Sequence, residues 1–283
     1  MRCPIKLNRN NFPQWFLRLV PNADDPRSLI NMSAETKVFS RFVSPIKIGT
    51  TYKSTEPERH KLADRAILNV AKNLQTCPVV LDLGISDGTT SLELIEKLGN
   101  RFNKYFATDI YLSLPYLEHK GDGVFYHPQN HECIMRVSDR FIIYKATEKS
   151  ISPIKALANH FIMTSPPYDI EKVQSLHLIH PQLRRLALED NRIVLTEHDI
   201  MLEWQFDNPD IIKVANVLNL SYFSKEQIAR AIANLKSSLK IGGHLFIVEN
   251  RDIEKVSHFT KDKSGFCLNE TINGGSEITD LVQ

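Results

Sequence analysis

The stretch that decides the fold reads Pro78-Val79-Val80-Leu81-Asp82-Leu83-Gly84-Ile85-Ser86-Asp87-Gly88-Thr89-Thr90. Its first half is a short apolar run ended by a glycine, a pattern typical of a strand buried in a parallel sheet. Residues 89–98 then place Leu92, Ile95 and Leu98 at helical spacing. Residues 105–110 form a second apolar run. Strand, helix and strand in this order predict a βαβ unit with a right-handed crossover.

The same alternation returns in the second half of the chain. Further buried strands are predicted at residues 192–197, 211–215 and 244–248. A helix is predicted from Ser224 to Leu239, opened by a capping box with Gln227. An antiparallel edge hairpin is predicted at the extended stretches near residues 256–259 and 265–272. The fold class is therefore α/β, with a seven-stranded, mostly parallel sheet and an antiparallel edge hairpin.

Two segments interrupt this alternation. Residues 1–60 are punctuated by proline and hold ten Lys and Arg against five Asp and Glu, a local charge of +5. They predict a basic N-terminal cap with a short helical segment. Residues 112–190 predict an insertion made of a hairpin and helices. We expect a domain at 61–283 that carries this insertion, with the cap and the insertion folding over its cleft as a lid.

The composition limits the classes of function. Hydrophobic residues make up 42% of the 283, and Lys and Arg number 35 against 33 Asp and Glu. These values exclude a disordered chain and argue against a protein that coats DNA. The four cysteines show no C-x-x-C spacing, which fits free thiols in a reducing compartment. With no recognisable signal peptide or spanning segment, we predict a cytoplasmic protein without a membrane partner.

The residues Asp82 to Thr90 lie where a strand gives way to a helix. Glycines there permit a positive φ and a close approach of backbone to ligand, and the first N–H groups of the helix are available to an anion or carboxylate. The alternative is a tight turn in which Asp87 is the N-cap of the helix. The spacing differs from G-x-G-x-x-G, and no lysine follows as in a P-loop, so NAD and ATP are less favoured.

Asp109 ends the second predicted strand, 27 residues after Asp82. A carboxylate in that place can accept hydrogen bonds from both hydroxyls of a nucleoside ribose. A solvated aspartate at a strand end is the alternative. The glycine loop upstream favours the ribose.

In combination, these motifs resemble the class I S-adenosylmethionine-dependent methyltransferases over roughly residues 60–283. Asp82-x-Gly84-x-Ser86-x-Gly88 is similar to that family's acidic-x-Gly-x-Gly-x-Gly loop, with Ser86 in place of the middle glycine. Asp109 matches the ribose acid, and Glu197-His198-Asp199-Ile200 resembles the adenine clamp after strand three. Residues 216–224 resemble the strand-four end of chemotaxis-receptor methyltransferases, and residues 239–245 resemble the LKPGG turn.

The resemblance implies a Rossmann-like fold, S-adenosylmethionine as cofactor, and methyl transfer to a small molecule or a protein side chain. It implies cofactor contacts from Asp82, Gly84, Ser86, Asp87, Gly88, Thr89, Thr90, Asp109, Ile110, His198, Asp199, Ile200 and Asn216. We expect the acceptor pocket to include Tyr52, Tyr168, Asn219 and Tyr222, of which the last three are also candidate catalytic residues. Methyl transfer is a displacement governed by positioning, so no obligatory catalytic triad is expected.

A second motif leaves an alternative open. Ser165-Pro166-Pro167-Tyr168 resembles the motif of amino-methyltransferases that act on adenine N6 or cytosine N4, in which the tyrosine stacks on the base. That motif follows strand four, whereas strand four is predicted at residues 211–215. A loop between helices is therefore the favoured interpretation, and a nucleic-acid acceptor is less favoured.

Two further interpretations concern binding without methyl transfer. One is a non-catalytic module that keeps the fold, binds the cofactor and acts on a partner. The other is a metal site at His127, His131 and Cys133. A hairpin turn would bring those side chains together without a metal, and no fourth ligand is apparent, so we predict no metal. The sequence leaves the oligomeric state open.

Overall fold

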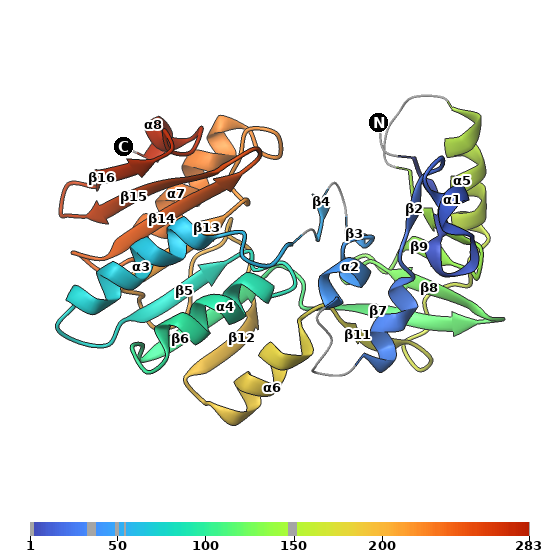
Figure 1. Cartoon of the computed structure of the whole chain (residues 1–283), viewed down its shortest axis with the longest axis horizontal. Coiled ribbons are helices and arrows are strands. Elements are labelled where there is room, and N and C mark those ends of the chain that lie inside the picture. Colours follow the sequence, from blue (N-terminus) through green and yellow to red (C-terminus); the bar gives the residue numbers. More distant parts are fainter. Residues whose placement is uncertain (1–2, 33–37, 49–50, 54, 147–151, 283) are drawn as a thin grey trace. The chain divides into compact units, whose positions relative to one another are not determined.

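The computed structural model describes residues 3–32, 38–48, 51–53, 55–146 and 152–282, and the chain divides into two compact units (Figure 1). The first unit joins Met1–Ser54 to Ser113–Pro181, and the second joins Thr55–Leu112 to Gln182–Gln283. Each unit is built on its own seven-stranded sheet. The N-terminal segment and the insertion therefore fold together as one unit. Their action as a lid stays a prediction.

The sheet of the second unit has the order β12-β6-β5-β13-β14-β15-β16. The first five of these strands run parallel, and β15 and β16 are antiparallel to their neighbours. The strands are β5 (Val79–Leu83), β6 (Lys104–Asp109), β12 (Ile193–Glu197), β13 (Ile211–Ala215), β14 (His244–Asn250), β15 (Glu254–Lys261) and β16 (Phe266–Ile272). This arrangement confirms the predicted α/β class, the mostly parallel sheet and its antiparallel edge hairpin.

Helices cover this sheet on both sides. Figure 1 shows α3 (Lys61–Asn73) and α4 (Thr89–Leu98) on one face and α7 (Lys225–Ser238) on the other. The remaining helices of the unit are α6 (Pro181–Glu189) and α8 (Thr279–Val282). The capping box predicted for α7 is confirmed: Gln227 N–H donates to Ser224 Oγ, and Ser224 N–H donates to Gln227 Oε1.

The alternation of side chains along β5 gives the two faces different chemistry. Leu81 and Leu83 face the hydrophobic core beneath α7, together with Ile228 and Leu235 of that helix. Asp82, between the two leucines, points to the opposite face, where it contacts Ser91 of α4. The α7 face is therefore an apolar core, whereas the face under α3 and α4 contains buried charges.

The first unit is larger than the predicted hairpin insertion. Its sheet has the order β11-β7-β8-β9-β10-β1-β2. These strands are β1 (Ile5–Asn8), β2 (Asn22–Ala23), β7 (Ser113–His119), β8 (Asp122–Tyr126), β9 (Cys133–Val137), β10 (Phe141–Tyr144) and β11 (Gln174–His177). A two-stranded sheet joins β3 (Lys47–Ile48) to β4 (Thr51–Tyr52). The hairpin prediction thus captured only β8, β9 and β10.

Helices in the first unit are short apart from one. They are α1 (Gln14–Leu17), α2 (Phe39–Val43), α5 (Pro153–Met163) and the 3₁₀ helices η1 (Arg9–Asn11) and η2 (Pro26–Asn31). The insertion predicted at residues 112–190 consists of a hairpin and helices, but it also contains β11. Its sequence, Gln-Ser-Leu-His, has one buried side chain, so no apolar alternation marked it. Within the described residues, none of the helices has the length and apolar character needed to span a bilayer.

Candidate cofactor site

The predicted cofactor residues gather at one edge of the second unit's sheet. From β5 the chain moves outward to β6 and β12, and later returns to form β13 and β14 on the other side of β5. The direction of winding therefore reverses between β5 and β13. Open α/β sheets bind ligands at such a point, beyond the carboxyl ends of the strands. All the predicted cofactor positions follow, or lie at the end of, β5, β6, β12 or β13.

The loop after β5 has the backbone of a glycine-rich turn, although a serine occupies its centre. Gly84, Ser86 and Gly88 have φ of 73°, 61° and 80°. Left-handed backbone is favourable for glycine and unfavourable for serine. Ser86 therefore adopts the conformation expected of the glycine that it replaces. The N–H groups of Gly84 and Ile85 donate to Thr108 O at 2.8 and 3.0 Å, which ties the loop to β6.

Gly84 is also fixed by a close neighbour. A Cβ built on it would lie 2.1 Å from Val217 Cγ2, in the segment that follows β13. No side chain fits at that distance. The loop after β5 and the segment after β13 therefore meet at a position where a side chain is excluded.

Asp87 is a completely buried carboxylate in this loop. Its Oδ1 accepts the N–H of Thr89 at 2.9 Å, so the capping interaction of the alternative interpretation is present in part, although Gly88 is the N-cap of α4. Its Oδ2 has no hydrogen-bond partner among the described residues. A buried carboxylate oxygen of this kind suits a ligand that donates a hydrogen bond or carries a positive charge.

Asp109 lies next to the same loop. Its Oδ2 accepts the N–H of Ser86 at 2.7 Å, and its Oδ1 accepts the N–H of Tyr111 at 3.4 Å. The side chain is nearly buried, with 8% of the residue exposed. The structure thus brings the predicted ribose acid into contact with the predicted cofactor loop.

The residues that follow β12 lie next to Asp109, at the same edge of the sheet. His198 N–H donates to Asp109 O at 2.9 Å, and burial lowers the pKa of the His198 ring despite the nearby Asp199. Asp199 Oδ1 accepts the N–H of Met201 at 2.9 Å, closing a turn. Ile200 belongs to the hydrophobic core, whereas Ile110 is 42% exposed. Ile200 is the predicted adenine contact, but of these two predicted cofactor contacts it is Ile110 that has apolar surface available to a flat ring.

Comparison with known proteins gives structural neighbours only. No family model and no curated protein matches the chain. N-methyltransferase NodS from Bradyrhizobium japonicum WM9, in complex with S-adenosyl-L-homocysteine, is 14% identical with a TM-score of 0.38, over 80% of this chain and 73% of NodS. CurJ carbon methyltransferase is 13% identical with a TM-score of 0.37, over 68% of this chain and 35% of CurJ.

A third neighbour is a putative sarcosine dimethylglycine methyltransferase from Galdieria sulphuraria, 12% identical with a TM-score of 0.34, over 68% of this chain and 45% of that one. This chain thus spans less than half the length of the second and third neighbours. Because the identities and TM-scores are low, the fold assignment rests on strand order: numbered along the second unit, the sheet reads 3-2-1-4-5-6-7. The fold is Rossmann-like.

Beneath the loop of this Rossmann-like unit lies a buried polar network. Asp82 Oδ2 accepts hydrogen bonds from Ser91 Oγ at 2.7 Å and Tyr105 OH at 2.6 Å. Lys213 Nζ of β13 lies 3.8 Å from the same oxygen. Burial and the adjacent Asp82 raise the pKa of Tyr105, so its hydroxyl stays a donor. The Asp82 carboxylate is therefore occupied inside the core, and we expect it to support the loop rather than touch a ligand.

Lys213 is a fully buried cation. Its Nζ lies 3.4 Å from Asp64 Oδ1 of α3, and Lys97 Nζ of α4 lies 2.6 Å from Asp64 Oδ2. Burial opposes the charge on Lys213, but Asp82 and Asp64 outweigh it and raise the pKa of the ammonium. Ion pairs thus join α3, α4, β5 and β13 beneath the predicted cofactor loop. Sequence reasoning missed Lys213, although a lysine inside the apolar run Ile211–Ala215 was a visible signal.

The residues after β13 are held by local hydrogen bonds. Asn216 has a φ of 58°, and its Oδ1 accepts the N–H of Asn250 at 2.7 Å. Asn219 Oδ1 accepts the N–H of Ser221 at 3.1 Å, and Tyr222 is 52% exposed. Asn219 therefore shapes the turn. Tyr222 has free surface at the edge where an acceptor is predicted.

The other two acceptor candidates belong to the first unit. Tyr52 lies in β4. The Tyr168 ring stacks on His131, with centroids 4.0 Å apart, and Tyr126 OH donates to Pro166 O at 2.9 Å. The segment Ser165–Tyr168 thus packs on the β8–β9 hairpin instead of following β13. Among the described residues, which include His127, His131 and Cys133, no group of three or more His, Cys, Asp or Glu side chains could hold a metal ion.

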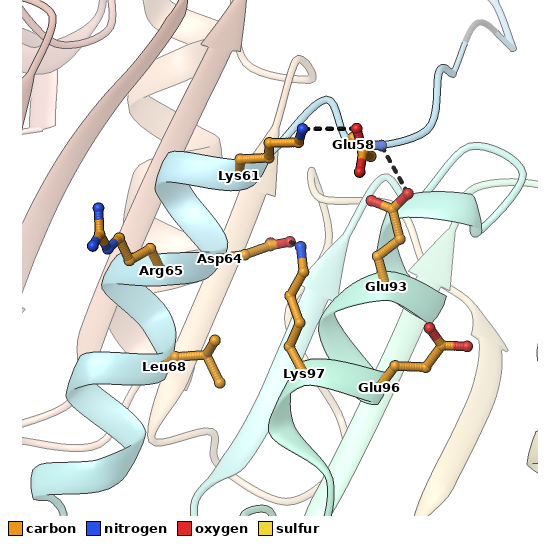
Figure 2. Close-up of a pocket in the computed structure, with 8 residues that line it drawn as sticks. All are labelled: Glu58, Lys61, Asp64, Arg65, Leu68, Glu93, Glu96 and Lys97. Carbon is orange, nitrogen blue, oxygen red and sulfur yellow. Dashed lines mark hydrogen bonds and ion pairs between the residues drawn. The ribbon is translucent and has the colours of Figure 1, made fainter.

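A separate pocket lies on the α3–α4 side of the second unit (Figure 2). Its volume is about 460 Å³, and Lys61 pairs with Glu58 at 2.7 Å across its rim. Burial raises the pKa of Glu93, whose Oε1 accepts the N–H of Glu58. The lining residues are Glu58, Lys61, Asp64, Arg65, Leu68, Glu93, Glu96 and Lys97. None of them is a predicted site residue.

Proposed function

We propose that the second unit binds S-adenosylmethionine and transfers its methyl group to an acceptor. The observation that carries this proposal is Asp87 Oδ2, a buried acceptor without a donor in the loop that Asp109 also contacts. Leaving a buried acceptor unsatisfied costs about 1–3 kcal/mol, and more when the group is charged. A bound ligand that supplies a donor would recover that free energy.

The charge of the edge favours a cationic cofactor. Asp87 and Asp109 are both buried there, and residues 84–90 contain neither lysine nor arginine. A phosphate would meet two carboxylates and no cation, which disfavours ATP and NAD. S-adenosylmethionine instead has an ammonium group and a sulfonium group. The two carboxylate acceptors at this edge fit these cationic groups.

Each residue then has a separable task. Asp109 accepts hydrogen bonds from the ribose hydroxyls, Asp87 accepts from the α-ammonium, and Ile110 covers one face of the adenine. The bound cofactor supplies an electrophilic methyl group. Holding donor and acceptor in line contributes as much as about 7–11 kcal/mol to such reactions. A general base is needed only for a protonated acceptor, which is a small molecule or a protein side chain in this proposal.

Calorimetric titration tests the proposal. S-adenosylhomocysteine, ATP and NAD are titrated into the full chain and into Asp87→Asn, which keeps one amide oxygen for Thr89 N–H. We expect micromolar binding of S-adenosylhomocysteine alone, weakened about tenfold or more in the variant. Binding of ATP or NAD in its place, or no binding to a folded chain, overturns the proposal. Transfer of a labelled methyl group then separates an enzyme from a non-catalytic module.

A further inference from the structure

His60 is buried against the carboxyl end of β13. Only 5% of it is exposed, and it precedes α3 as the N-cap without a side-chain capping hydrogen bond. Its Nε2 lies 3.3 Å from Nδ2 of Asn216, the first residue after β13. The next residue, Val217, is the one that packs on Gly84 of the cofactor loop. The imidazole thus contacts the segment that closes on that loop.

The hydrogen-bond directions around His60 can be assigned from neighbouring groups that can only donate or only accept a hydrogen bond. The N–H of Asn250 can only donate, so the Asn216 atom 2.7 Å from it is the amide oxygen. The other Asn216 atom, Nδ2, is then a donor. Because it faces His60 Nε2, that nitrogen must accept. The proton of the neutral ring therefore lies on Nδ1.

Asn250 supports the same assignment. Its Nδ2 donates to Arg59 O at 2.9 Å, which leaves its Oδ1 to accept from Asn216 Nδ2 at 3.2 Å. Asn216 Nδ2 thus has two acceptors, Asn250 Oδ1 and His60 Nε2. Reversing either amide would set donor against donor.

The ring stays neutral, since an imidazolium would place a second N–H against Asn216 Nδ2. Burial, reinforced by the charges of Lys213, Arg59 and Lys97, lowers the pKa of His60 to about 2. Nδ1–H is therefore a donor throughout the physiological range of pH. It has no hydrogen-bond partner within the part of the chain that the structure describes.

We propose that His60 Nδ1–H donates to the carboxylate at the amino-acid end of the cofactor, an inference that rests on the proposed function. The roles proposed for Asp109 and Asp87 give the direction: the ribose lies at the end of β6 and the methionine portion at the loop after β5. The next strand is β13, and His60 contacts Asn216 at the end of that strand. An amino-acid end is zwitterionic. Asp87 Oδ2 offers an acceptor for its ammonium, and His60 Nδ1–H offers a donor for its carboxylate.

Two substitutions separate the nitrogens of the ring. His60→Gln keeps a polar group near Nε2 and removes the donor at Nδ1, whereas His60→Asn keeps an amide donor near Nδ1. Each variant is titrated with S-adenosylhomocysteine and with 5′-methylthioadenosine, which lacks the amino-acid end. We expect His60→Gln to lose about tenfold in affinity for the first ligand and nothing for the second, and His60→Asn to recover part of the loss.

Nitrogen-15 NMR of the wild-type imidazole gives a readout independent of affinity. Nδ1 is expected to be the protonated nitrogen, and its proton should shift downfield with S-adenosylhomocysteine but not with 5′-methylthioadenosine. An equal loss for both ligands in His60→Gln, or an Nδ1 proton unchanged by either ligand, overturns the assignment and leaves a buried water as the partner. If neither ligand binds the wild type, the proposed function fails, and this assignment fails with it.

Discussion

The N–H of Ser86 donates to Asp109 Oδ2 at 2.7 Å, joining the loop after β5 to the end of β6. Ser86 holds a φ of 61°, a region in which a residue with a Cβ is strained. The carboxylate therefore stabilises a loop shape that the serine alone disfavours. One side chain serves both the loop and the predicted ribose site.

Replacing the charge of Asp109 while keeping an acceptor tests its predicted role. Asp109→Asn keeps an amide oxygen for Ser86 N–H but loses the charge and one acceptor. We expect S-adenosylhomocysteine to bind about 10- to 100-fold more weakly, because charge-assisted hydrogen bonds are worth roughly 1.5–3 kcal/mol. Calorimetry measures the change, and circular dichroism checks the fold. Wild-type affinity in Asp109→Asn would refute the ribose assignment.

Gly84 should be intolerant of any side chain. In Gly84→Ala, the new Cβ would lie 2.1 Å from Val217 Cγ2 on a backbone at φ 73°. Overpacking and left-handed strain together should cost about 2–4 kcal/mol of unfolding free energy, measured in urea.

Two companion variants separate the steric cost from the backbone cost. Gly242→Ala in the same unit is the closer match, since Gly242 has a φ of 79° and no neighbour within 4 Å of its Cβ position. It should lose about 1 kcal/mol. Val217→Ala should restore stability in the Gly84→Ala background. Equal losses at the two glycines, without rescue, would show that the contact with Val217 has no effect.

The buried lysine gives a third prediction. Lys213→Met leaves Asp64 and Asp82 without their shared cation, and removing one partner of a buried ion pair costs about 3–5 kcal/mol. Because the chain has two tryptophans, a Trp15→Phe background lets Trp204 fluorescence report urea unfolding of the second unit. Adding Asp64→Asn and Asp82→Asn should recover much of the loss. A single Lys213→Met variant as stable as wild type would contradict the network.

The second unit could be predicted from sequence because the residue pattern within each segment identifies it as a strand or a helix. The strand at residues 211–215 and the helix at residues 89–98 match the structure at both ends, since apolar runs and a glycine boundary define them. The first unit could not be predicted in the same way. Its β1 pairs with β10, from Ile5 to Ile143, and nothing in either segment specifies so distant a partner.

The candidate site was likewise predictable where a local motif marks it, and not where distant residues meet. Gly84, Ser86 and Asp109 stand at motif positions, and the structure places them together. The orientation of Asp82 into the core depends on Ser91 and Tyr105, which carry no motif. The His60–Asn216 contact joins residues 156 positions apart. Only the fold brings such residues together, so the sequence motifs identify the loop but not the residues that support it.

The depressed pKa of His60 predicts a loss of stability in acid. Its pKa is about 2 in the folded chain, below the unfolded value of about 6.5, so the unfolded chain takes up the proton first. The contribution is complete above pH ~6.5 and is lost as the pH falls, at about 1.4 kcal/mol for each pH unit. Burial also lowers the pKa of His244 and His258, which steepens the wild-type profile in the same direction.

Urea unfolding at several values of pH between about 7.5 and 4.5, followed by Trp204 fluorescence in the Trp15→Phe background, measures this dependence. His60→Gln should flatten the slope by about one proton below pH ~6.5, because glutamine does not titrate. His160→Gln, at an exposed position on α5 of the other unit, controls for the substitution itself. Parallel profiles for wild type and His60→Gln would mean that His60 has the same pKa in the folded and unfolded chains, and the neutral ring assigned to His60 would then be wrong.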